Sequence, residues 1–171
     1  MGNTWWRQIG LFILLIFLQI LLFNKIHLLG YATPLPYIYI LLKLPIGMNR
    51  NAVVLIAAFI GLVLDLFNYT LGLHMLACTI VGFLRYYLLK IFTPRDILDS
   101  ASPSFATFDK GLFLRYAGIF TVIHHFVLFT TEYFSFVDPL SLVFRIAGSF
   151  VLTFILIYAF ESVNEIIDAK R

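Results

Sequence analysis

Five long segments of this chain are almost entirely apolar, and this restricts the possible folds more than any other feature. Most of them have the roughly 17–25 residues that a helix needs to cross a lipid bilayer, and the second is near the short end of that range. The segments are Trp6–Phe23, Ala52–Phe67, Leu71–Phe92, Leu112–Phe134 and Pro139–Phe160.

The composition excludes a water-soluble globule. Of the 171 residues, 61% are hydrophobic and 12% are charged, whereas soluble domains average roughly 45–50% and about 25%. A soluble domain of this length could not bury so much apolar surface. The sequence therefore predicts an all-α, polytopic membrane protein that forms one integral domain over residues 1–171.

A sixth apolar segment, Leu28–Leu44, is shorter and contains Gly30, Pro34 and Pro36. Proline is tolerated in the first turn of a helix, and a bilayer excludes irregular backbone unless protein covers it. Two interpretations stay open. The segment is either a short span that begins near Pro34 behind a protein-covered lead-in, or a re-entrant hairpin.

The distribution of basic residues favours six spans. With six spans and a cytoplasmic amino end, nine basic residues lie inside and only Lys25 lies outside, whereas five spans give seven against three. The positive-inside rule therefore predicts a six-transmembrane-helix bundle with both termini in the cytoplasm. The nine residues are Arg7, Lys43, Arg50, Lys90, Arg95, Lys110, Arg115, Lys170 and Arg171.

The one sizeable polar loop, residues 93–111, lies in the cytoplasm in this topology. It is rich in Ser, Pro and Asp and has few apolar residues. We interpret it as a solvated connector or as a docking site for a cytosolic partner.

No catalytic, metal or cofactor pattern is present in the sequence. The four histidines belong to no G-x-S-x-G or H-E-x-x-H motif, and the basic residues are too scattered for nucleic acid. His124 and His125 are consecutive, so on a helix they point about 100° apart and cannot both ligate one metal. We expect one to face neighbouring helices and the other to face lipid or a cavity, in a protein that is not an enzyme.

Charged residues inside apolar segments are costly in a bilayer and are therefore candidates for structural or functional roles. Asp65 precedes the end of its segment by a few residues, and Arg145 follows the start of another. Their depths agree to within a few ångströms, so we predict that they pair. Arg85 lies nearer the opposite surface, where Glu161 is its predicted partner. Both pairs either specify the fold or contact a partner or ligand.

Three further residues near Asp65 are candidates for a structural or partner-binding role. Gly61 lets two helices approach closely in lipid, and Gly72 suits the turn between two spans. His74 opens the next span, where it either caps the turn or binds a partner.

The stretch GLVLDLF at residues 61–67, followed by LGLH at residues 71–74, resembles the signature of the rod shape-determining protein MreD family. The segment GYATPLPYIYILLKLP at residues 30–45 is similar to the second span in one branch of that family. The resemblance covers nearly the whole chain and is most specific over the 25 residues from Gly61 to Arg85.

This resemblance implies a non-enzymatic scaffold of the cell elongation machinery in the bacterial inner membrane. It implies binding to MreC, a single-span protein, and a link to MreB, RodA and a penicillin-binding transpeptidase, with membrane lipids around the bundle. The expected mechanism is docking of the single span of MreC against the helices, which helps to position peptidoglycan synthesis along the side wall.

The family's bundle is also similar to the substrate-binding subunits of energy-coupling-factor transporters. The alternative function is therefore a small-molecule binding subunit of a membrane transporter. Such a subunit needs a cavity with convergent polar groups. The predicted lining groups, all near the outer face, are Asn68, Thr70, His74, Glu132 and Asp138.

Overall fold

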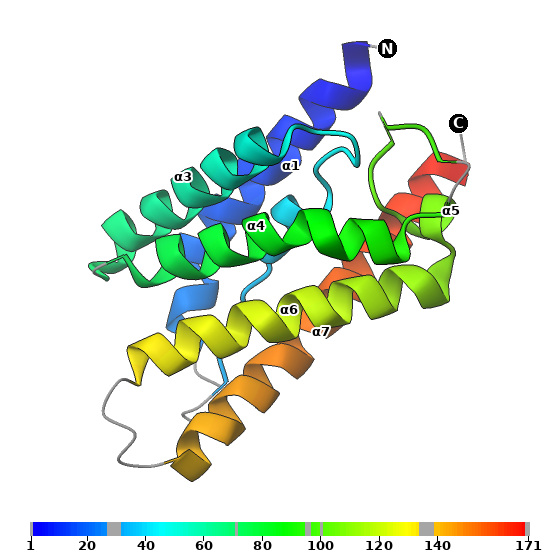
Figure 1. The fold of residues 1–171 in the computed structure, drawn as a ribbon. Coiled ribbons are helices and arrows are strands. Elements are labelled where there is room, and N and C mark those ends of the chain that lie inside the picture. Colours follow the sequence, from blue (N-terminus) through cyan, green and yellow to red (C-terminus); the bar gives the residue numbers. More distant parts are fainter. Residues whose placement is uncertain are drawn as a thin grey trace.

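The computed structural model describes residues 2–26, 32–70, 72–94, 97–99, 101–133 and 139–169, with side chains from residue 10 to residue 167. The long and short helices lie together in one bundle (Figure 1). The elements are α1 (Gly2–Leu21), η1 (Phe23–Lys25), α2 (Ile38–Leu42), α3 (Arg50–Asn68), α4 (Leu73–Phe92), α5 (Phe105–Phe108), α6 (Lys110–Glu132) and α7 (Pro139–Ala169). The predicted all-α class is confirmed.

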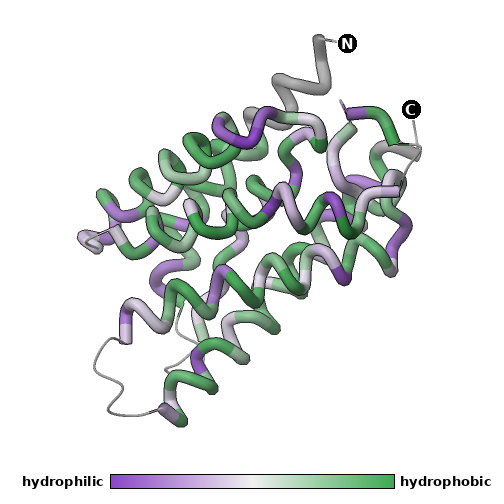
Figure 2. The backbone as a smooth tube through the Cα atoms, viewed as in Figure 1, coloured by the Kyte–Doolittle hydropathy of each residue, from purple (hydrophilic) through white to green (hydrophobic). Residues whose placement is uncertain are grey.

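Within the described residues, four helices are long and apolar enough to cross a membrane: α3, α4, α6 and most of α7. The described apolar part of α1, Gly10–Lys25, is shorter. Hydrophobic residues cover most of the length of these helices (Figure 2), and many point outward, such as Leu55 with 70% of its surface exposed and Phe59 with 66%. This arrangement is compatible with a multi-pass membrane protein. The count of six spans stays a prediction.

Helices α3 and α4 form a tight hairpin. Helix α6 packs against α4, and α7 packs against α6. A Cβ atom added at Gly61 would overlap the backbone of Met75 and lie 2.6 Å from the carbonyl oxygen of His74. Gly61 therefore sets the close approach of the two helices. Between them, Tyr69 and Gly72 take left-handed backbone conformations, with φ of 55° and 79°, which reverses the chain over a few residues.

The two ends of the bundle can be told apart by their contacts. We call them the Asn68 end and the Arg50 end, after the last and first residues of α3. Asn24, just after α1, donates to the Oδ1 of Asn68 at 2.5 Å, so α1 and α3 end together and run parallel. The first turn of α1 and the last turn of α7 lie at the opposite end (Figure 1).

Because α1 and α3 are parallel, residues 26–49 must return the chain from the Asn68 end to the Arg50 end. The described part, which we call the core segment (residues 32–44), runs through the interior of the bundle. It is extended up to Leu35, turns at Pro36 and Tyr37, and is helical only in α2. Residues 37–42 are at most 2% exposed.

The core segment runs parallel to α7. The amide of Thr33 donates to Ser149 and the amide of Leu35 donates to Thr153, both at 2.9 Å, while Tyr39 reaches Glu161. Twelve residues of α7 separate Ser149 from Glu161, which is about 18 Å of helix. A re-entrant hairpin would return to its starting end, so that alternative is wrong. The helical part begins at Ile38 rather than near Pro34, and residues 28–31 lie outside the described residues.

The described part of the loop at residues 93–111 is exposed at Leu98 and Asp99 but packs against the bundle around α5, so it is not solvated throughout as the interpretation of a connector assumes. The rings of Phe105 and Phe108 are 5% and 1% exposed, and a Ser104–Thr107 capping box begins α5. The amides of Ile46 and Gly47 donate to carbonyl groups of this loop. Two aromatic rings supply enough apolar surface to hold the loop in place.

The direction of the core segment predicts opposite accessibility for its two flanks. In a Cys78→Ala background, cysteines placed at the exposed positions Lys25 and Asn49 should react with an impermeant maleimide from opposite faces of the membrane. Labelling of both positions from one face would contradict a segment that passes through the bundle.

Replacement of Gly61 tests the helix contact. We expect Gly61→Ala to lower the free energy of unfolding by about 1–3 kcal/mol, because the added methyl group forces α3 and α4 apart. The matched control is Gly10→Ala, since nothing lies within 4 Å of a Cβ atom at Gly10. Thermal unfolding in detergent measures both, and equal midpoints for the two variants would refute the packing role.

Candidate functional site

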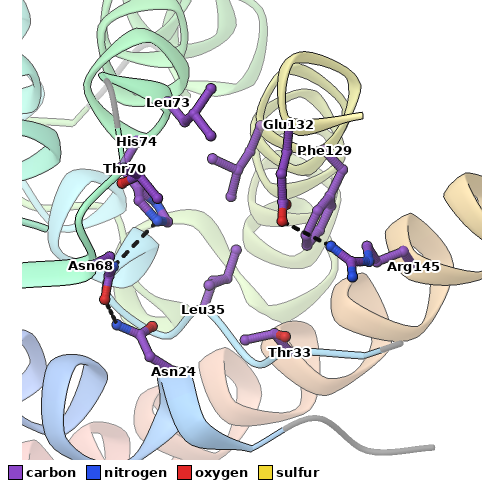
Figure 3. A pocket seen from close by; sticks show the side chains of 11 residues that line it. Asn24, Thr33, Leu35, Asn68, Thr70, Leu73, His74, Phe129, Glu132 and Arg145 are labelled. Carbon is purple, nitrogen blue, oxygen red and sulfur yellow. Dashed lines mark hydrogen bonds and ion pairs between the residues drawn. The ribbon is translucent and has the colours of Figure 1, made fainter. Parts of the chain in front are cut away.

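A cavity of about 230 Å³ opens at the Asn68 end. It lies where α3, α4, α6 and α7 meet the start of the core segment, and Leu35 and Thr33 lie between its two walls (Figure 3). The residues that line it are Asn24, Thr33, Leu35, Asn68, Thr70, Leu73, His74, Leu128, Phe129, Glu132 and Arg145.

The first wall is the turn between α3 and α4, and Asp65 builds it. The Asp65 carboxylate accepts hydrogen bonds from the amides of His74 at 3.0 Å and Met75 at 2.9 Å, and from the hydroxyl of Thr70. It thereby satisfies two of the amides that a helix start leaves without partners and places a negative charge at the positive end of α4. Asp65 is 4% exposed and holds the turn that carries Asn68, Thr70 and His74.

The predicted pair between Asp65 and Arg145 is wrong. Asp65 faces the amides of α4, and Arg145 pairs with Glu132 at 2.9 Å between α7 and α6. Arg145 and Glu132 form the second wall of the cavity, opposite Asn68 and His74 (Figure 3). Both charges do lie at the same end of the bundle, as their depths predict, but depth does not determine which face of a helix a side chain occupies.

A hydrogen-bonded chain of side chains leads from the first wall into the protein. Gln19 bonds to Asn24 at 2.6 Å, and Asn24 bonds to Asn68 at 2.5 Å. Asn68 then bonds to His74 at 3.4 Å. Inside the protein, Tyr37 bonds to both His74 at 3.1 Å and His124 at 2.9 Å. Through Tyr37, the core segment fixes the orientation of the imidazole in the cavity wall.

His124 and His125 are both fully buried, so the expectation that one faces lipid or a cavity is wrong. His124 bonds to Tyr37, and His125 bonds to the carbonyl of Thr121 and to Thr153 at 3.2 Å. Tyr37 of the core segment meets one face of α6 and Thr153 of α7 meets another, so polar partners are available on two faces of α6.

The predicted pair between Arg85 and Glu161 is also wrong. Glu161 pairs with Lys43 at 3.2 Å and accepts the hydroxyl of Tyr39 and the amide of Phe105. Arg85 donates to the carbonyl oxygens of Leu44 and Pro45. Both ionic side chains therefore hold the core segment. The sequence could not indicate this, because it does not show that residues 43–45 lie inside the bundle.

Four of the five predicted lining groups do line the cavity: Asn68, Thr70, His74 and Glu132. Asp138 lies outside the described residues. Sequence reasoning did not find Asn24, Thr33 and Arg145 as lining residues. Asn24 had a detectable signal, because it is polar and directly follows the first apolar segment.

Neither a metal-ligand set among the described residues nor a similar protein indicates what this cavity binds. In the part of the chain that the structure describes, no group of three His, Cys, Asp or Glu side chains is placed to hold a metal ion. Comparison with protein-family models, with curated proteins and with solved structures finds no match to this chain.

Asp65 gives a graded test of the turn. Asp65→Ala should lower the free energy of unfolding by about 1–3 kcal/mol, because two amides at the start of α4 and a hydroxyl lose their acceptor. Asp65→Asn keeps one acceptor oxygen and should cost less. Thermal unfolding in detergent ranks the variants, and an Asp65→Ala midpoint equal to that of the wild type would contradict the capping role.

Proposed function

We propose that this protein is a scaffold of the MreD type in the bacterial inner membrane, with both termini in the cytoplasm. The observation that carries the proposal is the stretch at residues 61–74, which resembles the family signature and has a coherent structural purpose here. Gly61 brings α3 and α4 together, Asp65 caps α4, and Gly72 makes the turn. The resembling residues thus act as one unit that builds the hairpin.

The buried candidate residues do not form the docking face. Gly61, Asp65, His74 and Arg85 are all buried, and each contacts other parts of the same chain. Arg145 is partly exposed but belongs to the cavity wall. The single span of a partner must therefore contact other side chains on the outside of the bundle.

The groove between α1 and α3 is our candidate for that contact, and we call it the α1–α3 groove. It has a volume of about 310 Å³ and an almost wholly apolar lining of Phe12, Ile13, Ile16, Ile40, Lys43, Leu44, Pro45, Met48, Ile56 and Ile60. Helices α1 and α3 contact each other little, which leaves apolar residues of the core segment at the floor of the groove. Van der Waals packing in such a groove is what associates helices in lipid.

In this function the protein binds the single span of MreC within the membrane. It belongs to the elongation complex with MreB, RodA and a penicillin-binding transpeptidase, and it helps to position peptidoglycan synthesis. The chain contributes shape and contacts rather than chemistry.

Co-purification tests the proposal. The protein should be recovered from detergent together with the MreC protein of the same organism. Ile13→Trp fills the α1–α3 groove and should weaken recovery by about tenfold, equivalent to roughly 1.4 kcal/mol. Ile155→Trp is the matched control, because both isoleucines lie on the outside of long helices and are 55% and 58% exposed.

No recovery of MreC with the wild-type protein would refute the scaffold. Equal recovery with both variants would exclude the α1–α3 groove as the docking face.

The second candidate is a small-molecule binding subunit of a transporter. The cavity at the Asn68 end favours it, because convergent polar groups from four helices surround an open space there. This function requires uptake of a solute in cells and a cytoplasmic energy-coupling partner. Loss of cell shape without any loss of uptake on deletion of the gene would decide for the scaffold.

A further inference from the structure

The two charged side chains that line the cavity in the described part of the chain are opposite in sign and adjacent. Arg145 Nη1 donates to Glu132 Oε1 at 2.9 Å, and the side chains are 23% and 41% exposed. Arg145 Nε is shielded from solvent and has no hydrogen-bond partner among the residues that the structure describes. A shielded guanidinium N–H without an acceptor costs free energy. Within the described residues, the second wall therefore has a cationic donor in excess of the acceptors around it.

The charge balance of these two residues restricts the ligand. One carboxylate and one guanidinium compensate each other, so a ligand with a net charge would leave one charge unbalanced at a partly buried site. A ligand that is neutral overall but carries both charges can replace the ion pair between Arg145 and Glu132. Its anionic group then binds Arg145, and its ammonium group binds Glu132. Each new contact is a charge-assisted hydrogen bond.

The opposite wall offers uncharged donors and acceptors in fixed positions. Asn68 is held by Asn24, and His74 is held by Tyr37 from behind. Thr70 is fixed by its bond to Asp65. A second layer of hydrogen bonds that fixes the lining groups in this way is what a binding site needs to recognise a ligand with little reorganisation.

The size of the cavity restricts the ligand further. Its volume of about 230 Å³ is below the roughly 300–1,000 Å³ of sites for drug-sized molecules. It corresponds to about seven or eight water molecules at the roughly 30 Å³ that each occupies in the liquid. This space suits a molecule of amino-acid size.

We propose that the cavity at the Asn68 end binds a small zwitterion, in which a primary ammonium group and a carboxylate or phosphate lie a few bonds apart. Two sources share this chemistry: a free amino acid and the headgroup of an aminophospholipid. The inference goes beyond the scaffold function. It deepens the second candidate by naming a ligand class, but it requires no transport.

Calorimetric titration of the full-length protein tests the proposal in dodecyl maltoside, a detergent without zwitterionic headgroups. β-Alanine probes the free source and glycerophosphoethanolamine probes the headgroup source. N-acetyl-β-alanine, which lacks the ammonium group, is the control on the ligand side. At least one zwitterion should bind, and the acetylated compound should bind at least about tenfold more weakly, as expected for the loss of one charged hydrogen bond.

Variants locate the site. Arg145→Gln and Glu132→Gln should each raise the Kd of the bound zwitterion by about tenfold or more. Glu165→Gln is the matched control, because Glu165 forms a similar exposed ion pair with Lys110 at 2.9 Å and does not line the cavity. Its Kd should equal that of the wild type.

Binding of neither zwitterion would overturn the proposal, as would equal binding of the acetylated compound by the wild-type protein. The comparison between ligands needs no variant and stands even where a substitution prevents folding. Failure here leaves co-purification with MreC unaffected, because Ile13 and the α1–α3 groove share no residue with the cavity lining.

Discussion

The structure depends on one constraint: a largely non-helical segment passes through an apolar bundle, and its backbone polar groups need partners there. Lipid offers none, so irregular backbone at this depth must be covered and satisfied by protein. Side chains supply the partners. Ser149 and Thr153 accept the amides of Thr33 and Leu35, Gln19 donates to the carbonyl of Pro34, and Arg85 donates to those of Leu44 and Pro45.

This constraint explains most of the polar residues inside the long helices. Glu161 balances Lys43 and also binds Tyr39, while His124 binds Tyr37. Where the core segment enters the bundle, the helices stand apart and the cavity opens. The same segment forms the floor of the α1–α3 groove at the other end. The candidate ligand site and the candidate docking face thus both arise because a largely non-helical segment fills less space between the long helices than another long helix would.

The helical class and the long helices could be predicted from apolar length alone, because 61% hydrophobic residues leave few alternatives. Four lining residues were also predictable, since polar groups near one surface of a bundle gather there. The charge pairs were not. Asp65 and Arg145 share a depth but face different neighbours, and Arg85 and Glu161 both turn to the core segment. Such choices depend on helix rotation and on a backbone path that hydrophobicity does not reveal.

Hydrogen–deuterium exchange in detergent tests the central claim most directly. If the core segment is buried and satisfied by side chains, the amides of Thr33 and Leu35, which donate to Ser149 and Thr153, should exchange as slowly as those in the middle of α6, although neither residue is helical. Exchange of these amides as fast as that of residues 97–99 in the loop before α5 would show that the segment is open to solvent and would contradict the account.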